Sequence, residues 1–307
     1  MHSIPPPPFS RILVDVDTAA SEHPAVDRAV ALAEACGATL TLVDVVSVPR
    51  TARPLPGGIE DALTEERSLA LTRMAAAITG VPATTVLLRG RRGTALIQQV
   101  LRGGHDLLMR SHTTQPGARP RAFGAVDTEL LRKCPCPVWL VRERRRPLVV
   151  GAVNASTSDE TEHALNRRIV GLTAALARVE QAEAVVLHAW IPFGERLIQS
   201  HASAAAAADY ATEVRDRTAR ELKALVASVV PEASGVRTSH RRGAPEDVIR
   251  AFVASHGADV VVMGSVARSG IAGLLFGNTA EAVIRKLPCS LLTLKPDGFE
   301  CPVRLDP

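Results

Sequence analysis

A glycine-rich segment near the end of the chain has residue types and spacing that could hold a phosphate group. It reads GSVARSGIAGLLFGN, covers residues 264–278, and lies between an apolar run at 258–263 and a helix-like run at 279–288. Turns from a strand into a helix bind anions, because free amides at the helix start point outward and glycine lets a ligand approach the backbone. Arg268 adds a cation within the segment. The segment is therefore a candidate ligand site.

Two residues of this segment suit phosphate less well than glycine and a hydroxyl would. Ala267 adds a methyl group where a sugar or phosphate would pass. Asn278 can cap a helix that starts at Thr279, with Glu281 three residues later as its capping-box partner. A cap uses the amides that a phosphate would use. Capping and ligand binding therefore stand as alternative roles for Asn278.

The segments that must position this loop occur twice in the chain. Apolar runs typical of buried parallel strands open each half at 11–17 and 148–154, and second strands follow at 39–46 and 184–190. Residues 90–111 also align with 243–265. Helical stripes of apolar residues separate the strands, and the alanine-rich stretch at 201–226 favours helix. The stripes are Val26, Ala29, Val30 and Ala33 in the first half, and Leu165, Ile169, Leu172 and Leu176 in the second.

This repeated order predicts an α/β protein of two tandem doubly wound domains. Each domain is expected to be a five-stranded parallel sheet with helices on both faces. We place the first domain at residues 9–142, the second at 147–298, and a C-terminal tail at 299–307. The linker contains Arg142, Arg144, Arg145 and Arg146, which we expect to be exposed to solvent.

Composition restricts the classes of function. The 307 residues are 46% hydrophobic and carry a net charge of +4 without a large basic cluster, so nucleic acid is not an expected partner. No apolar run approaches the ~18 residues of a membrane span. Five sparse cysteines favour reduced thiols in a cytoplasmic protein, with two of them in the core. The core pair is Cys136 and Cys289.

Several of these motifs together resemble the universal stress protein family. They are a strand that ends in Asp or Asn, GAPEDVI at 243–249, DVVVMGS at 259–265, and PCSLLTL at 288–294. The chain looks like two such domains in tandem, similar to the E-type tandem members of bacteria. The resemblance runs from about residue 9 to 305 and implies the adenine-nucleotide alpha-hydrolase-like fold. It also implies that the end strands WLV and LLTL pair, joining the domains as a pseudo-dimer.

In nucleotide-binding members of this family, a spaced set of glycines followed by a hydroxyl residue holds phosphate, and an Asp reads adenine. The second domain keeps Gly264 and Gly277 of that set, but it has Ala267, Asn278 and Asn154 at the other positions. The resemblance therefore gives one candidate ligand site in the second domain. Its residues are Asn154, Gly264, Ser265, Ala267, Arg268, Gly277, Asn278 and Thr279.

The first domain departs further from the pattern. It has Asp17 at the adenine position, Ser111 and Thr114 in place of two glycines, and Ala125 after Gly124. We expect Asp17 to cap its own turn, and His105 and His256 to lie at the surface. We expect His188 to be bonded locally. The first-domain counterpart of the site is not expected to bind nucleotide; it comprises Asp17, Ser111, His112 and Gly124.

These features predict a non-enzymatic stress-response protein that acts by binding a ligand or a partner through a degenerate loop in the second domain. No catalytic constellation or metal-ligand spacing is recognisable. ATP or another adenine nucleotide is a possible cofactor of the second domain. One alternative is an ATP-binding universal stress protein, and another is a structural or interaction module without a small-molecule ligand. A homodimer of the whole chain is expected.

Overall fold

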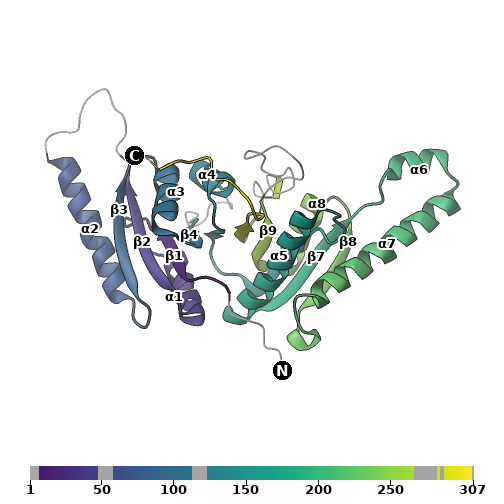
Figure 1. The fold of residues 1–307 in the computed structure, drawn as a ribbon, viewed down its shortest axis with the longest axis horizontal. Helices are drawn as coiled ribbons and strands as arrows, with labels where there is room; N and C mark the ends of the chain where they lie inside the picture. Colours follow the sequence, from purple (N-terminus) through teal and green to yellow (C-terminus); the bar gives the residue numbers. More distant parts are fainter. Residues whose placement is uncertain (1–6, 48–57, 113–122, 266–281, 284–286, 306–307) are drawn as a thin grey trace. The chain divides into compact units, whose positions relative to one another are not determined.

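The computed structural model describes residues 7–47, 58–112, 123–265, 282–283 and 287–305. These described residues form two compact units. The N-terminal unit contains those of 7–143 together with those of 290–305, and the C-terminal unit contains those of 144–289. Figure 1 labels many of the helices and strands of both.

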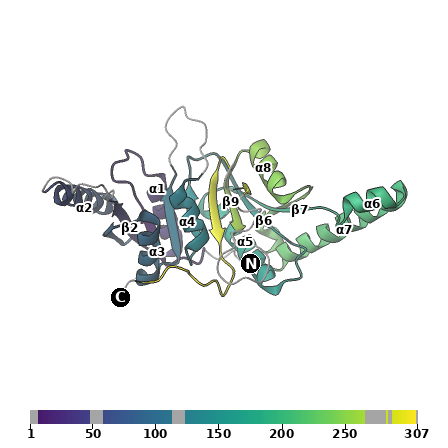
Figure 2. The same cartoon turned by 90° about the horizontal axis from the view of Figure 1, so that it is seen from above.

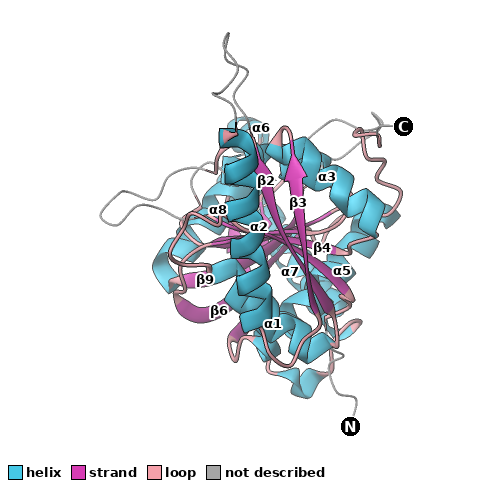
Figure 3. Cartoon of the chain, turned by 90° about the vertical axis from the view of Figure 1, so that its left-hand side faces the viewer, coloured by secondary structure: helices cyan, strands magenta, loops and turns pink. Residues whose placement is uncertain are grey.

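Five parallel strands form the centre of the N-terminal unit, in the order β3-β2-β1-β4-β5. This is a doubly wound sheet, in which the chain first builds outward from β1 and then returns to the other side. Figure 3 shows α2 and α3 on opposite sides of β2 and β3. The elements are β1 (Arg11–Asp15), α1 (Pro24–Cys36), β2 (Thr39–Val46), α2 (Ile59–Ala77), β3 (Ala83–Arg89), α3 (Arg92–Gly103), β4 (Leu107–Ser111), α4 (Ala125–Lys133) and β5 (Val138–Val141).

A sixth strand, β10 (Ser290–Leu294), completes this unit from the far end of the sequence. It runs antiparallel to β5, with Leu291 opposite Leu140 and Thr293 opposite Val138. The expected pairing of the WLV and LLTL strands is therefore confirmed. The residues after β10 continue past α4 and α3, as the yellow trace in Figure 1 shows.

Four parallel strands form the sheet of the C-terminal unit, in the order β9-β6-β7-β8. The α/β class with parallel sheets is therefore confirmed in both units. Figures 1 and 2 both show α6 beside the start of α7. The elements are β6 (Arg146–Val153), α5 (Glu160–Val179), β7 (Glu183–Trp190), α6 (Glu195–His201), α7 (Ala204–Ala227), a 3₁₀ turn (Glu232–Ser234), β8 (Arg237–Arg242), α8 (Pro245–His256) and β9 (Ala258–Gly264).

Local sequence signals explain where these helices begin and end. Pro24 occupies the first turn of α1, and Gly37 ends that helix with φ of 70°. Asp159 caps α5 by accepting a hydrogen bond from the amide of Glu162. Ser203 caps the alanine-rich α7 in the same way. The predicted apolar stripes of α1 and α5 face the sheets and are mostly buried.

Candidate functional site

Buried charges gather at the carboxyl ends of three parallel strands in the N-terminal unit. Asp15 ends β1, Asp44 lies in β2, and the side chains of both are inaccessible to solvent. Arg92, in the first turn of α3, places Nη1 2.6 Å from Asp15 Oδ1 and Nη2 2.6 Å from Asp44 Oδ1. One guanidinium thus joins two strands, and this pairing offsets the unfavourable position of a cation at a helix start.

The same network extends on both sides of Arg92. Arg67 of α2 and the hydroxyl of Thr18 both donate to Asp44 Oδ2, at 3.0 and 2.7 Å. On the other side, Arg110 of β4 binds Asp15 and places Nε 2.9 Å from Asp127 Oδ1. Asp127 lies in the first turn of α4, where the helix dipole favours a carboxylate. The result is a continuous run of alternating charges from α2 to α4.

His112 is the last member of this run. Its Nδ1 lies 2.9 Å from Asp127 Oδ2, and its ring meets Phe123 edge-on at 5.0 Å. The guanidinium of Arg142 lies over the same Phe123 ring, with Cζ 4.5 Å from the ring centre. We call the group Arg67, Asp44, Arg92, Asp15, Arg110, Asp127 and His112 the strand-end ion chain.

The expectation that Arg142 is solvent-exposed in a linker is wrong. Arg142 is only 5% exposed. Its guanidinium stacks on Phe123, and its backbone amide donates to Ser290 Oγ at 3.0 Å. The surface position expected for His105 is also wrong. That residue is 8% exposed, and its Nδ1 lies 3.2 Å from the carbonyl oxygen of Gln99.

Burial and the neighbouring hydrogen-bond donors shift the pKa values of the ion-chain carboxylates in opposite directions. Burial raises the pKa of Asp15, while Arg110 and Arg92 act in the opposite direction. Burial also disfavours charge on Asp44, but hydrogen bonds from Thr18 and Arg92 bring its pKa below the ordinary value. For Asp127, burial is likewise outweighed by His112 and Arg110, and the pKa is lowered. Asp44 and Asp127 are therefore ionised partners and not proton donors.

The other predicted residues of the N-terminal unit have local structural roles. Asp17 Oδ1 accepts from the amide of Ala19 at 3.1 Å, which confirms that it caps its own turn. Ser111 Oγ accepts from the amide of Ala25 at the start of α1. Gly124 precedes α4 and donates its amide to Asp127. Thr114 lies outside the described residues.

In the C-terminal unit, Asn154 follows β6 at the corresponding position. Its Nδ2 donates to Glu162 Oε1 at 2.9 Å, and its amide donates to Asn166 Oδ1 at 3.1 Å. Asn166 in turn donates to the Asn154 carbonyl at 2.8 Å. The Asn154 side chain is therefore held by the first turn of α5, next to the carboxyl end of β6.

His188 supports the same turn from β7. It is buried, its Nδ1 lies 3.1 Å from Val153 O, and its Nε2 lies 3.4 Å from Ser156 Oγ. The expectation of local bonding is confirmed. His240 of β8 continues from it, stacking at 5.8 Å on His188 and at 5.3 Å on Trp190. These stacked rings join the ends of β7 and β8.

Gly264 ends β9, and its lack of a side chain has a packing reason. A Cβ at this position would lie 2.8 Å from Leu165 Cδ2. Ser265 follows it and is fully buried. The remaining residues of the candidate site lie outside the described residues; they are Ala267, Arg268, Gly277, Asn278 and Thr279.

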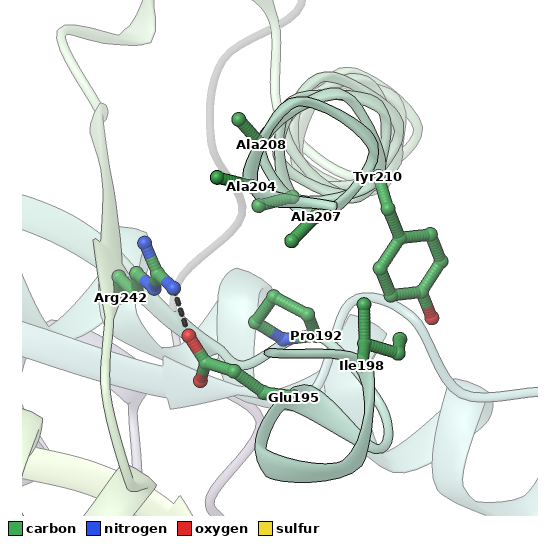
Figure 4. A pocket seen from close by; sticks show the side chains of 9 residues that line it. Pro192, Glu195, Ile198, Ala204, Ala207, Ala208, Tyr210 and Arg242 are labelled. Atoms are coloured by element: carbon green, nitrogen blue, oxygen red, sulfur yellow. Dashed lines mark hydrogen bonds and ion pairs between the residues drawn. The ribbon is translucent and has the colours of Figure 1, made fainter. Parts of the chain in front are cut away.

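A pocket of about 380 Å³ lies between α6, the start of α7 and the end of β8 (Figure 4). Alanines of α7, Pro192 and Ile198 give it apolar walls, and Arg242 and Glu195 form an ion pair at one side. Phe193 next to it is 90% exposed. A volume of this size is within the range of small-molecule sites, and its walls suit an apolar portion of a ligand.

Sequence reasoning missed the ion chain and this pocket. The signal for the first was present, since Asp15, Asp44 and Arg110 are charged residues inside apolar strand runs. No group of three or more His, Cys, Asp or Glu side chains in the described residues is arranged to hold a metal. Among the described helices, none combines the length and apolar character that crossing a bilayer requires.

Known proteins match this sequence along nearly the whole chain. A model of the universal stress protein family matches residues 8–142 and again 149–295. Universal stress protein E of Photorhabdus laumondii is 31% identical over 309 residues, which cover 96% of this chain and 98% of the relative. Universal stress protein E of Escherichia coli K12 is 31% identical over 318 residues, with 97% and 98% covered.

Two solved structures show the same fold. A protein of unknown function from Pseudomonas aeruginosa PAO1 superposes with a TM-score of 0.68 at 22% identity, and the match covers 94% of this chain and 93% of that one. A universal stress protein from Archaeoglobus fulgidus superposes with a TM-score of 0.62 at 14% identity, covering 93% and 98%.

Proposed function

The chain belongs to the universal stress protein family, and from this premise we propose that it acts in the stress response by binding a ligand or a partner and not by catalysis. The strand-end ion chain carries this proposal. Every carboxylate in it already has an arginine partner, so the charged groups of the ion chain are paired with one another. A general base or nucleophile needs a group that is free to act on a substrate.

The ion chain also disfavours a nucleotide in the N-terminal unit. A phosphate entering at the strand ends would approach the ionised Asp44 and Asp127, and it would have to compete with them for Arg92 and Arg110. Ser111 and Gly124, at two positions where the family pattern has glycine, bond instead to the starts of α1 and α4. We propose that ATP affinity is lost or much reduced in this unit.

We propose that a small-molecule ligand, if the protein carries one, binds the C-terminal unit. Asn154 can offer adenine both a donor and an acceptor, but Glu162 already accepts from its amide nitrogen. ATP, another adenine nucleotide or a different molecule of that size remain alternatives. The described cysteines are not in disulfides, and reduced thiols suit a cytoplasmic location.

A second candidate function is a pure interaction module, and exposed apolar side chains of the C-terminal unit favour it. Ile191, Phe193 and Leu197 are 47%, 90% and 65% exposed within seven residues of one another. Exposed groups of this kind mark protein interaction surfaces. We propose a homodimer of the whole chain that covers these residues. Light scattering on the purified protein tests it, and a monomer at micromolar concentration would contradict it.

Identification of the bound molecule decides between the two functions. The purified protein is denatured, released small molecules are identified by mass spectrometry, and the stripped protein is titrated with ATP by calorimetry. ATP binding that Gly277→Val abolishes and Gly124→Ala preserves would support a nucleotide site in the C-terminal unit. No released molecule, together with no heat at millimolar ATP, would support the interaction module and contradict the nucleotide alternative.

A further inference from the structure

Two buried thiols lie next to each other where α4 ends and β5 begins. Cys134 is inaccessible to solvent, Cys136 is 8% exposed, and their Sγ atoms are 3.5 Å apart. A disulfide requires about 2.05 Å between the sulfurs, so roughly 1.5 Å of side-chain movement would join them. Pro135 between them limits the backbone conformations available to this short loop.

The segment after β10 covers this end of α4 and binds its last carbonyls. Lys295 Nζ donates to Leu131 O at 2.5 Å and to Arg132 O at 3.2 Å, and Cys301 Sγ lies 3.3 Å from Lys133 O. Carbonyls in the last turn of a helix have no partner within the helix, so these side chains cap α4. Figure 1 shows the tail passing this helix.

The surroundings give the two sulfurs different reactivity. Burial lowers the pKa of Lys295 to about 8, and Cys134 and Cys301 act on that ammonium in the opposite direction. The pKa of Cys136 is raised well above its ordinary value by its hydrogen bond to Cys134 and by burial. The Cys136 thiol therefore resists ionisation, and we assign the first attack to Cys134.

We propose that Cys134 and Cys136 are a redox pair that a hydroperoxide converts to an intramolecular disulfide. The Cys134 thiolate attacks one oxygen of hydrogen peroxide, the O–O bond breaks, and the leaving hydroxide takes up the thiol proton as water. Cys136 sulfur then attacks the sulfenic sulfur, the S–O bond breaks, and a second water leaves with the Cys136 proton. The two thiols lose two electrons and the peroxide gains two.

The full-length protein provides a direct test without any variant. It is treated with hydrogen peroxide and then unfolded, free thiols are blocked with N-ethylmaleimide, and tryptic peptides are analysed by mass spectrometry. Both cysteines fall in one peptide, CPCPVWLVR, at residues 134–142. We expect this peptide to lose two hydrogen atoms, to resist the maleimide, and to recover both thiols after dithiothreitol. Complete labelling of both cysteines at every peroxide dose would overturn the proposal.

Variants separate the two roles and exclude other partners. In Cys136→Ala we expect Cys134 to be trapped as a sulfenic acid by dimedone, whereas in Cys134→Ala we expect Cys136 to stay reduced at the same dose. Cys289→Ala removes another buried thiol and is the matched control, which should leave the disulfide unchanged. Loss of the disulfide in Cys301→Ala would assign the bond to the tail and overturn the pairing.

Discussion

Arg92 binds Asp44 with Nη2 2.6 Å from Oδ1, although the arginine stands in the first turn of α3, where a helix disfavours a cation. The same guanidinium binds Asp15 through its other terminal nitrogen. Two strands and a helix therefore depend on one side chain. Many doubly wound proteins hold a ligand at the carboxyl ends of their strands. In the N-terminal unit of this protein, internal ion pairs occupy that position.

Removal of the Arg92 guanidinium should destabilise the N-terminal unit strongly. Arg92→Met leaves Asp15 and Asp44 buried with fewer partners, and breaking a buried pair in this way costs about 3–5 kcal/mol. The free energy of unfolding from urea titration measures this loss. Arg89→Met is the matched control, because Arg89 and Glu60 form a pair whose side chains are 57% and 45% exposed. That change should cost about 1 kcal/mol or less, and equal losses in the two variants would contradict the role of the ion chain.

Two loop glycines, one in each unit, should respond differently to alanine. At Gly264 a new Cβ would lie 2.8 Å from Leu165 Cδ2, so Gly264→Ala should cost about 1–3 kcal/mol by overpacking. At Gly124 the nearest atom, Asp127 Oδ2, lies at 3.7 Å and φ is −75°, so Gly124→Ala should be nearly neutral. Thermal unfolding measures both.

A compensating change tests the cause at Gly264. Leu165→Val shortens the side chain that the new methyl group would meet, so Gly264→Ala combined with Leu165→Val should be less unstable than the sum of the two single changes. Strict additivity would indicate that the glycine serves something other than packing against α5.

Asn154→Asp, which restores the family's acidic residue, should destabilise the C-terminal unit unless Glu162 also changes. Asn154 donates to Glu162 at 2.9 Å, so Asn154→Asp replaces a hydrogen bond with two facing carboxylates and should cost about 1–2 kcal/mol. Glu162→Gln in the same chain restores a donor and should recover most of this stability. ATP calorimetry on the double variant, compared with Glu162→Gln, then shows whether the acidic residue improves affinity. Equal stability of Asn154→Asp and the double variant would contradict this account.

Local patterns predicted most of the fold, because helices and buried strands are specified by residues close together in the sequence. The turn at Asp17 was predictable for the same reason, since its partner Ala19 is two residues away. The ion chain was not, because Asp15 meets Arg92 and Arg110 across more than 70 residues. Each charge alone is an anomaly in an apolar strand, and only the order of the strands brings them together.

The buried ammonium of Lys295 should make stability rise in mild alkali. Its pKa is lowered by burial from 10.5 to about 8, so between these values the unfolded chain binds more protons than the folded protein. The free energy of unfolding therefore increases with pH in this window, by about 1–3 kcal/mol in total. Other groups titrate there too, so the comparison with Lys295→Met isolates the effect, because that variant lacks the lysine and should have a flatter profile. Parallel profiles for the two proteins would show that Lys295 keeps its ordinary pKa and that the end of α4 is open to water.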